Sequence, residues 1–156
     1  MSGWLLDTRL FKHLAPGEGG RKPSFRNWVS ASAGPIFLSI ISVVDINARI
    51  QKVHDTPQEP RRAELDVWLQ GIVAHYGDRI HPVDAEVAMR AGVLMNRSQA
   101  FAGRNLSDLL LAATAQIHGH GLVTERKSDF IPMKSGIELW DPFEQGLPGK
   151  RPKSTG

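Results

Sequence analysis

Four aspartates stand at places along the chain where a protein built on a parallel β-sheet does its chemistry. Asp7 comes directly after the apolar run of residues 4–6, and Asp129 follows a short apolar run at 122–123. Asp45 and Asp108 fall in the first turns of predicted helices. Acids that meet at one rim repel one another unless a cation lies between them. Carboxylate oxygens without cysteine suit Mg²⁺ or Mn²⁺, ions that activate water against a phosphodiester.

Each aspartate also has a structural interpretation. Asp45 and Asp108 each stand three residues after a possible helix N-cap, so either can simply complete a helix start. Asp129 can cap a turn. Asp7 is the exception, because a carboxylate at the end of a buried strand is costly without a partner or a metal. The chemical hypothesis therefore depends on the four side chains converging in space.

The segments that position these aspartates alternate between strands and helices. Apolar runs predict strands at 4–6, 36–40, 80–83, 122–123 and 137–140. Apolar residues at helical spacing predict helices that begin near Ser24, Ser42, Leu65, Asp84 and Asn105. This alternation predicts an α/β fold, a mostly parallel sheet with helices on both faces. Sites in such sheets lie beyond the carboxyl ends of the strands.

Length and composition fit one globular domain. The chain has 156 residues, and we expect residues 1–143 to form the domain and 144–156 to form a disordered basic tail. The absence of cysteine excludes disulfides, thiolate metal sites and cysteine nucleophiles. A net charge of +3 permits a polyanionic partner without requiring one.

Targeting and membrane signals are not apparent. The first residues lack the basic and apolar regions of a signal peptide. The most apolar stretch, residues 36–44, is about half as long as the ~20 residues that a bilayer needs. We expect a soluble, cytoplasmic protein.

Five segments together resemble a PIN-domain ribonuclease, and in particular the VapC toxins of bacterial type II toxin–antitoxin pairs, in their FitB-like branch. The similarity covers about residues 3 to 143 in the family's order and spacing. The most specific parts are the Asp-x-x-x-Ala-Ala-Thr-Ala block at 108–115 and the Thr-x-x-x-x-Asp-Phe block at 124–130. The other segments are Leu-Leu-Asp-Thr at 5–8, Leu-Ser-Ile-Ile-Ser at 38–42 leading to Asp45, and Asp-Pro-Phe at 141–143.

This resemblance implies a three-layer α/β/α sandwich, RNA cleavage that depends on Mg²⁺ or Mn²⁺, a homodimer, and inhibition by a small antitoxin. It also implies roles for individual residues. Asp7 and Asp108 become the main metal ligands, while Asp45 and Asp129 position the water or a second ion. Thr8 and Thr124 become the polar supports beside this acidic cluster.

The chain departs from the family pattern at three places. The family usually has Glu where this chain has Asp45, and Asn where it has Arg9. Arg9 can bind a phosphate bidentately, or it can pair with the acids and compete with the metal. The Arg-Asn often found after the Thr of the fourth strand is Glu125-Arg126 here. The residues that can hold RNA phosphates are Arg9, Arg104 and Arg126.

Two alternatives to a ribonuclease stay open. A catalytically attenuated PIN module would keep the fold but act as a protein- or RNA-binding regulatory partner, with Arg9 neutralising the acids. A metal-dependent DNA nuclease would use the same carboxylates on another polymer. The sequence specifies no RNA target, because RNA is recognised through loop shape and stacked bases.

Overall fold

A five-stranded parallel sheet forms the centre of the computed structural model, which describes residues 3–17, 23–31, 35–54, 56, 60–98 and 105–146. The strands are β1 (Trp4–Leu6), β2 (Ile36–Ser39), β3 (Ile80–His81), β4 (Gly121–Val123) and β5 (Leu139–Trp140). Their order across the sheet is β3-β2-β1-β4-β5, and all neighbouring pairs of these strands run parallel. The predicted fold class is confirmed.

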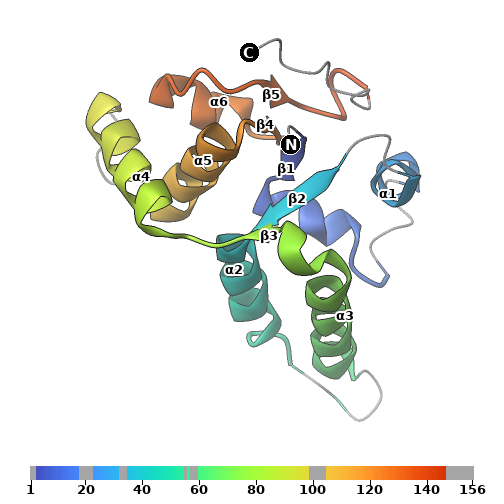
Figure 1. Ribbon diagram of the computed structural model, residues 1–156. Helices are drawn as coiled ribbons and strands as arrows, with labels where there is room; N and C mark the ends of the chain where they lie inside the picture. The colour runs from blue at the N-terminus through green and yellow to red at the C-terminus, as the bar shows by residue number, and fades with distance from the viewer. Residues whose placement is uncertain are drawn as a thin grey trace.

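Helices cover both faces of the sheet (Figure 1). They are η1 (Thr8–His13), α1 (Pro23–Ala31), α2 (Ile40–Ile50), α3 (Arg61–Tyr76), η3 (Gly77–Arg79), α4 (Ala85–Arg97), α5 (Leu106–His118), α6 (Lys127–Phe130) and η5 (Ile131–Met133), where η marks a 3₁₀ helix. One core joins η1, α1, α2 and α3 to the sheet, and the other joins α4, α5, α6 and η5 to its opposite face. The molecule is thus a three-layer α/β/α sandwich.

The central strands are apolar throughout because they contribute to both cores. Successive strand residues point to opposite faces. Leu6 belongs to the core under η1 and α2, whereas Leu5 belongs to the core under α4 and α5. In β4, Val123 and Leu122 divide in the same way, and all four side chains are fully buried. A parallel sheet covered on both faces requires this pattern.

The two edge strands are shorter than predicted. β3 has two residues instead of the four expected at 80–83, and β5 begins at Leu139 instead of residue 137. Pro82 follows β3 directly and has no N–H to donate to a neighbouring strand. Short edges also leave fewer unpaired backbone groups for another chain to bind.

The helices that follow β3 and precede β4 begin as predicted. The Asp84 side chain accepts a hydrogen bond from the Val87 N–H at 3.0 Å and caps α4. The Asn105 side chain accepts one from the Ser107 N–H at 2.9 Å and caps α5. Gly119 ends α5 with a φ of 69°, a left-handed conformation that glycine adopts without strain.

The start of α2 was predicted wrongly. Ser39, the last residue of β2, accepts a hydrogen bond from the Ile41 N–H at 3.1 Å and caps the helix, which begins at Ile40. Ser42 does not cap the helix because it is fully buried, with its hydroxyl 2.8 Å from that of Thr8. Asp45 consequently lies in the second turn of α2 and not in its first.

Some expectations fall outside the described residues. Arg104 lies in the segment 99–104, and residues 147–156 make up most of the expected tail. The domain boundary at 143 and the disorder of the tail therefore stay predictions. Within the described residues, no helix combines the length and apolar character needed to cross a membrane.

Candidate active site at the carboxyl ends of β1 and β4

Asp7 and Thr124 lie at the carboxyl ends of two neighbouring strands. From β1 the chain continues to β2 and β3 on one side, while β4 and β5 lie on the other, so β1 and β4 flank the switch point of the sheet. Ligand sites of open parallel sheets occur at such points. The Thr124 hydroxyl donates a hydrogen bond of 2.7 Å to Asp7 Oδ2, and both residues are fully buried. Such a partner is what allows the carboxylate to be buried.

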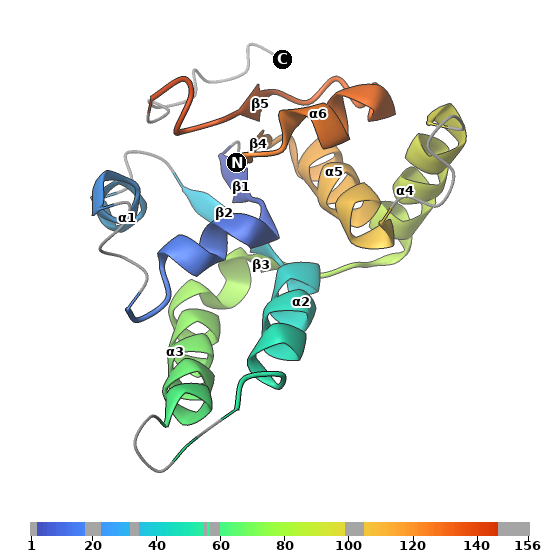
Figure 2. The ribbon, with the colours of Figure 1, turned by 180° about the vertical axis from the view of Figure 1, so that it is seen from behind.

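Two further aspartates reach the same place from helices α5 and α6. Asp108 lies in the first turn of α5, directly after the Asn105 cap, and is 6% exposed. Asp129 comes from the short helix α6, and its side chain is 39% exposed. In Figure 2 these two helices lie next to the end of β4. Three of the four predicted acids therefore approach one point.

The guanidinium of Arg126 fills that point. Its Nε and Nη2 donate to the two oxygens of Asp7 at 3.1 and 2.8 Å. Nη2 and Nη1 donate to the two oxygens of Asp108 at 2.9 and 3.0 Å, and Nη1 also donates to Asp129 Oδ2 at 3.2 Å. A guanidinium has five N–H donors. Each of the five therefore has a carboxylate acceptor.

Arg126 is also held at its backbone and along its side chain. Its backbone N–H donates to Thr124 Oγ1 at 2.9 Å, and its guanidinium carbon lies 5.4 Å from the centre of the Phe130 ring. Burial alone would lower the pKa of Arg126, but its hydrogen bonds to Asp108 and Asp7, and the charges of both, raise this pKa above its usual value. Arg126 is thus a permanently charged part of the cluster.

The fourth acid, Asp45, does not contact this arginine. Thr8 follows Asp7 and is linked to α2 by the pair of hydroxyls that it forms with Ser42. Asp45 lies three residues beyond Ser42 and so about one turn further along the same face of α2. Among the described residues, no hydrogen bond or ion pair joins Asp45 to Arg126 or to the other aspartates.

The carboxylates, as arranged here, do not fit a divalent metal ion. Mg²⁺ takes bare carboxylate oxygens at about 2.1 Å and completes an octahedron with water. Both oxygens of Asp7 and both oxygens of Asp108 instead accept hydrogen bonds from Arg126. Across the residues that the structure describes, no group of three or more His, Cys, Asp or Glu side chains is arranged to hold a metal. The cluster fits a planar guanidinium.

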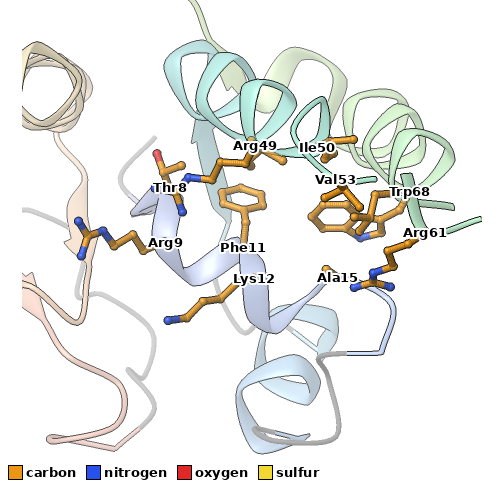
Figure 3. A pocket seen from close by; sticks show the side chains of 12 residues that line it. Thr8, Arg9, Phe11, Lys12, Ala15, Arg49, Ile50, Val53, Arg61 and Trp68 are labelled. Carbon is orange, nitrogen blue, oxygen red and sulfur yellow. The ribbon is translucent and has the colours of Figure 1, made fainter. Parts of the chain in front are cut away.

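The three predicted phosphate-binding arginines differ in their surroundings. Arg126 contacts the acids, and Arg104 lies outside the described residues. Arg9 is exposed and lines a cavity of about 370 Å³ between η1, α2 and α3, together with Lys12 and Arg49 (Figure 3). No ion pair between Arg9 and an acid is present in the described part of the chain. The arginine that pairs with the acids is Arg126, and Arg9 has no such role here.

A family model for the PIN domain matches residues 5–130. The chain belongs to the PIN domain family. That match includes Asp7, Asp45, Asp108 and Asp129, as well as Arg126. No curated protein matches the sequence of this PIN domain significantly.

Solved structures of toxin–antitoxin complexes contain chains with the same fold as this PIN domain. The FitAcB structure from Neisseria gonorrhoeae matches with a TM-score of 0.69 and 21% identity, covering 90% of this chain and 98% of that one. VapBC2 from Rickettsia felis, bound to a promoter DNA fragment, matches with a TM-score of 0.64 and 21% identity, covering 89% and 99%. VapBC-1 from nontypeable Haemophilus influenzae matches with a TM-score of 0.64 and 14% identity, covering 90% and 98%.

The sequence does not reveal the place of Arg126 in this PIN domain. It favours Arg9 as the residue that can neutralise the acids, and it indicates Arg126 as a residue that can hold an RNA phosphate within the Glu125-Arg126 departure from the family pattern. In the structure the two turn apart: Glu125 Oε1 lies 2.8 Å from His13 Nε2, and Arg126 turns to the acids. The available signal was the position of Arg126 three residues after the end of β4 and three before Asp129.

Proposed function

We propose that this PIN domain is an endoribonuclease of the toxin class that depends on Mg²⁺ or Mn²⁺. The observation that carries the proposal is the convergence of Asp7, Asp108 and Asp129 on one point at the switch point of the sheet. PIN domains are generally nucleases, and aspartates are usual ligands of a hard divalent ion when their oxygens are not occupied by another cation, as those of Asp7 and Asp108 are here by Arg126. Asp7 and Asp108 are the proposed metal ligands, and Asp45 and Asp129 the proposed positioning acids. Thr8 and Thr124 are their proposed polar supports.

The cavity beside η1 supports RNA as the substrate. Arg9, Lys12 and Arg49 line it, and within the described residues none of these three cations has an ion-pair partner. Figure 3 shows the Phe11 ring between Arg49 and Lys12, and Trp68 further along the cavity beside Arg61. Unpaired cations suit the phosphates of a single strand. The cavity also includes Thr8, the residue after Asp7, so a bound strand would pass next to the acids.

Three further properties belong to this proposal. A small antitoxin is the proposed inhibitor, because the structures of similar fold named above come from toxin–antitoxin complexes. A homodimer is the proposed assembly, and α4 offers a surface for it, with Met89 and Val93 one turn apart and 75% and 41% exposed. The cytoplasm, where RNA is the abundant polymer, is the proposed location.

A second function is favoured by one specific observation, the five hydrogen bonds of Arg126 to the acids. An arginine in this position would suit a catalytically attenuated PIN module that binds a protein or RNA without cleaving it. Its folded core and its outer surfaces would be the same as those of an active nuclease. Only a measurement of cleavage separates the two candidates.

The experiment offers structured RNA and single-stranded DNA to the purified, antitoxin-free protein over a range of Mn²⁺ concentrations. We expect cleavage of RNA that EDTA abolishes and that Asp108→Asn lowers at least roughly 100-fold, as removal of a main electrostatic contact does. The matched control is Glu86→Gln, which removes an exposed carboxylate of α4 and should leave cleavage unchanged. Cleavage of DNA alone would make the protein a DNA nuclease, and no cleavage by the wild type or by Arg126 variants would support the attenuated module.

A further inference from the structure

The acidic cluster carries its own counter-charge within the same chain. We infer that Arg126 is the cation that this site holds in the resting protein, and that a divalent ion binds only by displacing it. This inference depends on the proposed function in one respect, since it takes Asp7 and Asp108 as the ligands that the ion would use.

Arg126 uses all of its N–H donors on the carboxylates of the cluster. Its five donors meet five acceptor positions on three carboxylates, with donor–acceptor distances of 2.8 to 3.2 Å. Both forks of the guanidinium are bidentate, one toward Asp7 and one toward Asp108, which is the strongest geometry for this pair of groups. The side chain is 14% exposed. A surface arginine that pairs with an acid by chance has none of these features.

The backbone determines that this particular arginine reaches the acids. Arg126 lies three residues after the end of β4, and its N–H donates to the hydroxyl of Thr124, which in turn donates to Asp7. The Phe130 ring lies beside the guanidinium. Arg9, by contrast, is exposed and lines the cavity on the side of η1. The position of Arg126 is therefore built into the turn that leaves the sheet.

The charges of the cluster show that Arg126 competes with a divalent ion for the carboxylates and does not exclude it completely. Three carboxylates and one guanidinium leave two negative charges in excess, so the cluster still attracts a divalent ion. The oxygens that such an ion needs are already hydrogen-bonded to Arg126. A metal must break those hydrogen bonds before it can bind, and its apparent affinity falls accordingly.

The test compares Mn²⁺ binding, measured by isothermal titration calorimetry and by the shift in melting temperature, between the wild type and Arg126→Gln. Glutamine keeps a polar side chain but is shorter, and it removes the charge and most of the donors. We expect the variant to bind Mn²⁺ at least roughly tenfold more tightly, about the effect of one lost hydrogen bond to a charged group. Arg97→Gln, which removes a charge from the exposed end of α4, is the control and should bind as the wild type does.

Equal affinity in the wild type and Arg126→Gln, or no binding by either, would overturn the inference. Arg126→Gln leaves three acids without their counter-charge, so a measurement on the wild type provides a second test. The Nε–H resonance of Arg126, assigned with Arg126→Lys, should stay protected from exchange when millimolar Mg²⁺ is added. If this protection is lost at stoichiometric Mg²⁺, Arg126 does not compete with the metal, and the inference is refuted.

Cleavage assays on the same samples separate this inference from the proposed function. If Arg126→Gln binds Mn²⁺ more tightly but neither protein cleaves RNA, the proposed nuclease function is refuted. The inference that Arg126 competes with the metal then still holds. If the wild type cleaves RNA and binds Mn²⁺ as tightly as Arg126→Gln does, the nuclease function is supported and the competition by Arg126 is refuted.

Discussion

Asp7 is a fully buried carboxylate, and two neighbours make its burial possible. Thr124 donates to one of its oxygens, and Arg126 donates to both. Thr124 has a double role, because its hydroxyl also accepts the backbone N–H of Arg126. This one hydroxyl therefore orients both the acid and the arginine that neutralises it.

Replacing Thr124 by valine should destabilise the fold more than a typical loss of a hydroxyl. Asp7 loses a donor while it stays buried, and the N–H of Arg126 loses its acceptor, so we expect a loss of about 1–3 kcal/mol in the free energy of unfolding. The control is Thr114→Val in α5, where an equally buried hydroxyl donates to the Leu110 carbonyl, a hydrogen bond additional to the helix's own. Urea unfolding of both variants measures the difference, and equal losses would contradict this role of Thr124.

The convergence of three of the four acids could be predicted from the sequence, but their pairing with Arg126 could not. Asp7, Asp108 and Asp129 were found because each follows a strand or begins a helix at the rim where chemistry occurs. Arg9 was expected as the cation that can pair with these acids because it follows Asp7 and Thr8, although Arg9 and Arg126 both stand three residues after a strand end. What separates the two is the direction of the chain: η1 begins at Thr8 and carries Arg9 outward, whereas the turn at 125–126 directs Arg126 inward.

At the scale of elements, the boundary between β2 and α2 shows where sequence patterns fail. Two serines three residues apart can each cap a helix, and the pattern favours Ser42 because Ser39 falls inside the strand predicted at 36–40. The structure uses Ser39 instead, since Ser42 is needed inside the core against Thr8. Caps without a competitor, such as Asp84 and Asn105, were predicted correctly. A local sequence pattern therefore predicts the helix N-cap correctly only where the capping side chain makes no tertiary contact instead.

The pairing of β1 with β4 depends on a residue without a side chain. Gly121 lies opposite Trp4 in the register of the two strands, and a Cβ at Gly121 would overlap the Trp4 ring. That ring is itself buried and packs edge-on against Trp140 at 6.0 Å, so it has little room to move. We expect Gly121→Ala to lower the free energy of unfolding by about 1–3 kcal/mol, as overpacking does.

Gly92 provides the matched control for that substitution. It lies exposed within α4, and nothing lies within 4 Å of the Cβ that alanine would add. Gly92→Ala should therefore raise stability by up to about 1 kcal/mol, because alanine restricts the unfolded chain and favours the helix. Thermal melts of the two variants should move in opposite directions. A Gly121→Ala protein as stable as the wild type would mean that the Trp4 ring has an alternative position.

At the scale of the whole molecule, the net charge of +3 conceals two regions of opposite charge. The carboxyl ends of β1 and β4 gather negative charge around one arginine, while the cavity beside η1 gathers unpaired cations. In a third region, three histidines from β3, the end of α5 and the residue before β4 meet beside Phe37. The Gly3 N–H donates to His120 Nδ1 at 3.0 Å, so Nε2 of His120 carries the proton and donates to His81 Nε2 at 2.9 Å.

This arrangement requires a neutral His81 and so predicts a dependence of stability on pH. Burial and the nearby His118 lower the pKa of His81 to about 4 from its usual 6.5. Above pH 6.5 neither the folded nor the unfolded chain protonates this ring, and its contribution is complete. Between about pH 6.5 and 4 the unfolded chain takes up a proton that the folded chain does not, so the free energy of unfolding falls as the pH falls.

Carboxylates change the stability over the same range, and a variant isolates the part due to His81. Urea unfolding of the wild type and His81→Gln, measured between pH 7.5 and 4.5, should give curves that converge toward acid, because the variant has no ring to protonate. Asp78 and Arg79 line the same cavity and stay unchanged in this comparison. His54→Gln, at an exposed position, is the control and should run parallel to the wild type. Parallel curves for His81→Gln would mean that His81 titrates alike in the folded and unfolded chains, and that the hydrogen bond to His120 does not hold it neutral.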